Sequence, residues 1–266
     1  MNRLDVLFVV DTLMPGSVDR EQIAERLMRD ETQLEAMLDE NRLFQRLMKE
    51  EDVLIHISPW LFFTVLLRRA RRDLEREAFT IEQRGRQKVV LFDADHVVQL
   101  LAQEPVRDYL ATMLASFTRV ENVTVLAEQR PGVWRAYRTN ELNVEGMMRY
   151  SQTLDEAFRF APYKRIGDVC LFLTGMFPEY INGRYRYPLS GQLRPRMRGR
   201  LVQKAEDYEA YGQAFYRMAA EHEVASREGL ADVLITLSED FILAEKPLAF
   251  IANRYLQFSR HTLFGL

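Results

Sequence analysis

Two acids and a histidine stand within four residues at Asp93-Ala94-Asp95-His96, and these residue types can bind metal ions. A further alternative is an enzyme whose site is assembled only in three dimensions near Asp93, Asp95 and His96. Helix capping is the simpler interpretation: Asp93 caps a following helix, and Asp95 complements the positive end of its dipole. Because the sequence contains no second cluster of matching spacing, we expect capping and no metal site.

Two other polar groups also have ordinary explanations. Glu221, His222 and Glu223 are consecutive, and consecutive helical residues point about 100° apart, so they cannot converge on one ion from a regular helix. Cys170 lies inside an apolar run, which favours a buried structural cysteine over a nucleophile. The chain lacks the phosphate-loop, dinucleotide-binding, nucleophile-elbow and paired-histidine motifs, so we expect no cofactor.

The distribution of charge is the unusual feature of this sequence. Residues 182–204 include seven basic residues and no acid, and two tyrosines alternate with the first two arginines. The sign then reverses, because residues 205–245 carry ten acids against two arginines. We call residues 184–204 the basic segment, and its candidate contact residues are Arg184, Tyr185, Arg186, Tyr187, Arg194, Arg196, Arg198, Arg200 and Lys204.

The basic segment has two functional interpretations besides that of a solvated loop. Arginine makes planar, bidentate contacts with carboxylates and phosphates alike. Pairing with acidic residues, of this chain, of a second copy or of another protein, is the preferred interpretation, and it describes a non-enzymatic interaction protein. Nucleic-acid or other polyanion binding through the same segment is the alternative, with tyrosine as a stacking surface. The pI of 5.9 and the acidic residues that follow the segment disfavour that alternative.

The elements that position these residues are predicted to be mostly helices. Ser58-Pro59 is the strongest helix start, since serine caps and proline at the first position loses no hydrogen bond. Apolar residues at helical spacing from Phe63 to Ile81 extend this helix toward Gly85. Residues 166–177 are apolar nearly all round, which predicts a second core helix.

One segment is predicted to be extended. Residues 123–126 and 133–137 are rich in branched and aromatic side chains, and Pro131-Gly132 between them is a turn dipeptide. We therefore predict a mainly α fold, a multi-helix bundle with one short β-hairpin at about 123–137. The predicted domains are residues 1–140, ending in the hairpin, and residues 141–266, and a single domain is the alternative.

Composition limits the class of protein. Hydrophobic residues make up 47% of the 266 residues and charged residues 28%, as in folded globular chains. A single cysteine suits a reducing compartment, and no apolar run reaches the roughly 20 residues of a membrane-spanning helix. We expect a cytoplasmic protein without membrane insertion.

Two short stretches resemble known sequences. The run Gly167-Asp168-Val169-Cys170-Leu171-Phe172-Leu173-Thr174-Gly175-Met176-Phe177-Pro178 resembles a stretch found in uncharacterised bacterial proteins, and residues 116–120 resemble another. The resemblance implies a bacterial origin and no particular activity.

Overall fold

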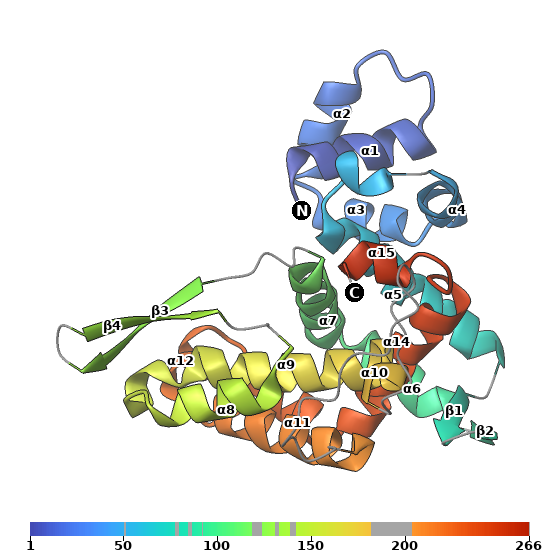
Figure 1. Ribbon diagram of the computed structural model, residues 1–266. Helices are drawn as coiled ribbons and strands as arrows, with labels where there is room; N and C mark the ends of the chain where they lie inside the picture. Colours follow the sequence, from blue (N-terminus) through green and yellow to red (C-terminus); the bar gives the residue numbers. More distant parts are fainter. Residues whose placement is uncertain are drawn as a thin grey trace. The chain divides into compact units, whose positions relative to one another are not determined.

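The computed structural model shows a mainly helical chain (Figure 1). It describes residues 1–50, 52–77, 80–84, 87–91, 93–118, 124–130, 133–138, 142–181 and 204–265. These residues form 15 α-helices, two short 3-10 helices and four strands. The chain divides into two compact units: the first unit is Met1–Arg119 with Asn253–Leu266, and the second unit is Val120–Ala252.

The first unit is built around α5 (Pro59–Glu77). Ser58 caps this helix, because its Oγ accepts a hydrogen bond from the Leu61 N–H at 3.2 Å. The predicted helix start is therefore confirmed. Every residue from Leu61 to Arg68 is buried, since α6 (Ala94–Ala102) and α7 (Glu104–Phe117) pack against α5.

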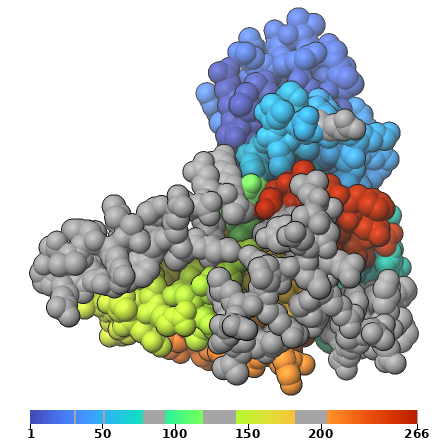
Figure 2. Space-filling view, viewed as in Figure 1, coloured from blue at the N-terminus to red at the C-terminus, as the bar shows by residue number. Residues whose placement is uncertain are grey.

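The remaining helices of this unit come from both ends of the chain. They are α1 (Arg3–Leu13), α2 (Arg20–Leu27), α3 (Glu31–Leu38), α4 (Asn41–Lys49), η1 (Val53–Ile55) and α15 (Arg260–Phe264). Phe63 of α5 stacks on Phe264 with ring centroids 5.7 Å apart. Figures 1 and 2 accordingly show the red C-terminal residues beside the cyan residues of α5.

A buried carboxylate joins α1 to the start of α5. Asp5 is fully buried, and its Oδ1 accepts a hydrogen bond from the Ser58 N–H at 2.7 Å. Its Oδ2 accepts bonds from the Ser58 hydroxyl at 2.8 Å and from the Asn2 N–H at 3.2 Å. Three donors therefore satisfy this acid inside an apolar core, as a buried charge requires.

The second unit centres on α9 (Phe160–Met176), which confirms the predicted core helix. Its other helices are α8 (Val144–Gln152), η2 (Glu156–Phe158), α10 (Pro178–Ile181), α11 (Ala205–Ala220), α12 (Glu223–Arg227), α13 (Ala231–Glu239) and α14 (Phe241–Arg254). α11 packs against α9, and Gly212 of α11 leaves room for the Phe241 ring of α14. A Cβ at Gly212 would collide with that ring and stand 3.1 Å from the Cβ of Cys170.

The described residues contain two hairpins, so the expectation of a single hairpin is not supported. β1 (Thr80–Arg84) pairs antiparallel with β2 (Gln87–Leu91), and β3 (Thr124–Arg130) pairs antiparallel with β4 (Val133–Arg138). The expected extension of α5 toward Gly85 is wrong, because α5 ends at Glu77 and Ile81 pairs with Val90. Both partners are β-branched, and this chemistry favours a strand although the position of Ile81 also fits a helical stripe.

The structure thus establishes the mainly helical fold class. It does not establish a domain boundary at residue 140. The division into domains 1–140 and 141–266 stays a prediction, since the compact units are defined by contacts within one chain. Sequence periodicity carries no information about which unit the last residues join.

Candidate functional site

Most of the basic segment lies outside the described residues. This applies to Arg184, Tyr185, Arg186, Tyr187, Arg194, Arg196, Arg198 and Arg200. Lys204 is described, is exposed, and occupies the N-cap position of α11. Its backbone N–H donates to Asp207 Oδ2 at 2.8 Å, so the chain enters the acidic helix through a backbone–carboxylate bond.

The candidate metal residues lie at the start of α6. Asp93 occupies the N-cap position without a side-chain cap bond, and Asp95 and His96 are exposed in the first turn. Within the described residues, no three His, Cys, Asp or Glu side chains lie close enough to hold a metal ion. The structure thus gives these three residues helix-start positions and no shared centre.

His222 has a structural role that the sequence did not indicate. Its Nδ1 accepts a hydrogen bond from the Val224 N–H at 3.2 Å, which caps α12. Its Nε2 lies 3.0 Å from the Glu156 carbonyl oxygen. Because Nδ1 is the acceptor, we assign the proton to Nε2, which donates to that carbonyl. The imidazole therefore bridges η2 and α12.

Cys170 is fully buried, as expected for a structural cysteine. Burial raises the pKa of its thiol far above the ordinary value of 9.0, and the charges of Glu245 and Asp168 raise it further. A thiol that stays protonated is neither a nucleophile nor a metal ligand.

An acidic surface lies where α11, α12 and α13 meet. We define it by four exposed acids, Glu221, Glu223, Glu228 and Asp232. Among the described residues none of these four forms an ion pair, whereas the nearby Glu239 pairs with Arg217 at 3.4 Å. The acidic surface therefore presents four carboxylates to solvent or to a partner.

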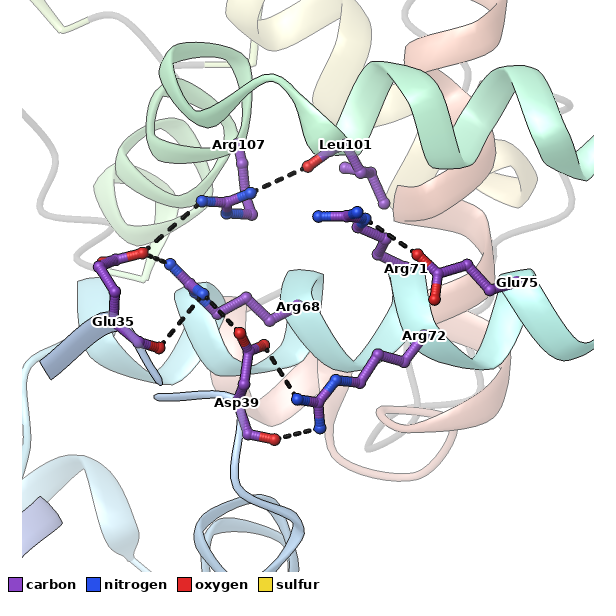
Figure 3. A network of polar contacts seen from close by, with 8 residues as sticks. All are labelled: Glu35, Asp39, Arg68, Arg71, Arg72, Glu75, Leu101 and Arg107. Atoms are coloured by element: carbon purple, nitrogen blue, oxygen red, sulfur yellow. Dashed lines mark hydrogen bonds and ion pairs between the residues drawn. The ribbon is translucent and has the colours of Figure 1, made fainter. Parts of the chain in front are cut away.

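The first unit contains an arginine network that sequence reasoning missed (Figure 3). Glu35 of α3 and Asp39, the C-cap of α3, face Arg68 and Arg72, one turn apart on α5. Arg68 contacts the Glu35 carboxylate through Nη2, and its Nη1 donates to Asp39 Oδ2 at 3.0 Å. Arg72 contacts both the backbone carbonyl and the carboxylate of Asp39.

Arg107 of α7 completes this network from the opposite side. Its Nη1 donates to the Leu101 carbonyl oxygen at 3.1 Å, and its Nη2 lies 3.8 Å from Glu35 Oε2. Two arginines that are only 7% and 5% exposed, Arg68 and Arg107, thus share one carboxylate. Their Nε atoms are buried without a hydrogen-bond partner, which is costly for a charged group.

The electrostatic strain shows in Arg68. Burial lowers the pKa of its guanidinium to about 10, and the neighbouring charge of Arg107 contributes to the shift. Arg68 still carries its charge at neutral pH, so it needs both acids of α3. The network fixes α3 to α5 and α7, and we assign it a structural role.

The comparisons with known proteins give no relative to guide the assignment. No family model, no curated protein and no solved structure matches this chain. No helix among the described residues is long and apolar enough to cross a membrane.

Proposed function

We propose that the protein acts as a non-enzymatic interaction protein whose basic segment binds an acidic protein surface. The partner that this chain itself supplies is the acidic surface of a second copy. The observation that carries the proposal is the exposure of Glu221, Glu223, Glu228 and Asp232 without ion pairs among the described residues. Seven basic residues within 182–204 supply the opposite charge.

The small free energy of each exposed ion pair favours a network of several contacts over single pairs. An exposed ion pair contributes about 0 to 1 kcal/mol, so no individual arginine can specify a partner. Several arginines facing several carboxylates, with water partly excluded, can set both orientation and partner choice. The acidic surface would also repel a polyanion that approached within the screening length of about 8 Å at cellular salt.

The test is a neutralisation experiment on the full chain. In the first variant, Arg194, Arg196, Arg198 and Arg200 are all replaced by glutamine. The matched control replaces four exposed arginines outside the basic segment and the acidic surface, Arg26, Arg29, Arg76 and Arg149, by glutamine. Light scattering after size exclusion reports the mass of each protein over a range of concentrations. We expect association in the wild type and in the control, and its loss in the first variant.

Salt and nucleic-acid readouts separate this proposal from its rival. Association that weakens with added salt supports ionic pairing. A wild type that stays monomeric, and instead retains nucleic acid with high absorbance at 260 nm, contradicts it and favours polyanion binding.

A further inference from the structure

The first unit has an open groove between α1 and α4. Its volume is about 460 Å³, within the range typical of small-molecule sites. One helix face forms its floor, because Arg42, Gln45, Arg46 and Lys49 recur at spacings of three and four on α4. The lining from the α1 side is Asp11 and Thr12, and Glu50 closes the end.

Arg42 and Arg46 are held in place by α1. Nη2 of Arg42 donates to the carbonyl oxygens of Thr12 and Leu13, at 2.8 and 3.1 Å, and so caps the C-terminal end of α1. Nη1 of Arg46 donates to Thr12 Oγ1 at 2.9 Å, and its guanidinium lies 4.1 Å from the centroid of the Phe8 ring. Both arginines keep further N–H groups for a ligand, since each guanidinium carries five.

The acids of the groove are already paired. Asp11 binds Arg20 at 2.9 Å, and Glu50 binds Arg46 at 3.1 Å. Arg42 contacts backbone carbonyls and no acid, and exposed Lys49 forms no ion pair among the described residues. Two positive charges on one helix face therefore lack a carboxylate, which suits an anion.

We infer that this groove binds a small ligand carrying a phosphate group. A tetrahedral oxyanion accepts hydrogen bonds from several donors at once, and an arginine fork beside a lysine is a common way to bind it. The groove is larger than a phosphate ion, and Gln45 offers an amide donor and acceptor to the rest of the ligand. The ligand class is a phosphate ester with a polar organic part. The proposed function through the basic segment is independent of this site.

Two variants and two matched controls test the inference. Lys49→Gln removes the ammonium group of Lys49, which forms no ion pair among the described residues. Gln45→Glu places a carboxylate in the middle of the groove. Both residues are exposed. The controls Arg29→Gln and Gln33→Glu make the same charge changes at exposed positions outside the groove lining. Titration calorimetry on the full chain uses adenosine monophosphate, adenosine and inorganic phosphate at constant ionic strength.

The expected result is binding of adenosine monophosphate in the millimolar range or tighter, weaker binding of inorganic phosphate, and none of adenosine. Lys49→Gln should weaken binding about tenfold, because a hydrogen bond to a charged group is lost. Gln45→Glu should abolish it, and both controls should bind as the wild type does. Equal binding of adenosine and its monophosphate, equal effects of variants and controls, or no binding of any probe would each overturn the inference.

Discussion

Replacing Glu35 by glutamine should lower the unfolding free energy of the first unit. Glu35 is the acid that Arg68 and Arg107 share. At the 3.8 Å between Arg107 Nη2 and Glu35 Oε2, an effective dielectric constant of about 20 gives roughly 4 kcal/mol of attraction. The Glu35 side chain is 35% exposed, so solvent screening reduces the net loss in unfolding free energy to about 2 to 3 kcal/mol.

Urea unfolding followed by circular dichroism measures this loss. The control is Glu25→Gln on α2, an exposed change that should stay within about 0.5 kcal/mol of the wild type. A double-mutant cycle with Arg107→Met isolates the pairwise part, because Glu35→Gln should cost less once the second guanidinium is gone. A Glu35→Gln variant as stable as the Glu25→Gln control would refute the claim that this arginine network holds α3 against α5 and α7.

Three further predictions concern buried groups. Asp5→Asn should lower the unfolding free energy by about 2 kcal/mol, since an amide cannot accept from all three donors that bond this carboxylate; chemical denaturation measures it. Gly212→Ala should cost about 1 to 3 kcal/mol by overpacking against Phe241, seen as a lower melting temperature. Cys170 should resist thiol reagents at pH 8 in the folded protein and react fully in urea. Because its pKa is raised in the folded state, its contribution to stability is present below its ordinary value of 9.0 and is lost as the pH rises above it. Fast labelling of the folded protein at pH 8 would contradict the burial of the thiol.

Local rules predicted the elements whose signals are local. Ser58 and Pro59 begin α5 as expected, because capping depends on neighbouring residues alone. The burial of residues 166–177 followed from an apolar run without a polar face. Ile81 was misassigned because its spacing fits a helix while its branched side chain fits a strand, and pairing with Val90 decided between them.

The polar contacts depended on pairing between distant segments. Arg68 on α5 contacts Glu35 and Asp39 on α3, and nothing near Arg68 in the sequence indicates its burial. The sequence does contain one signal for this network. Two acids, Glu35 and Asp39, are four residues apart, and so are two arginines, Arg68 and Arg72, so the two pairs can face each other. His222 likewise gained its role from the Glu156 carbonyl, which lies 66 residues earlier in the chain.

The central claim is that the basic segment of one copy binds the acidic surface of another, and a charge-swap mixing experiment tests it most directly. One variant changes Arg194, Arg196, Arg198 and Arg200 to glutamate, and a second changes Glu221, Glu223, Glu228 and Asp232 to arginine. Light scattering after size exclusion measures the mass of each variant alone and of the two mixed at equal concentration. We predict that each variant alone associates less than the wild type, and that the mixture recovers association because the reversed segment meets the reversed surface. A mixture no larger than its separate components would contradict the claim.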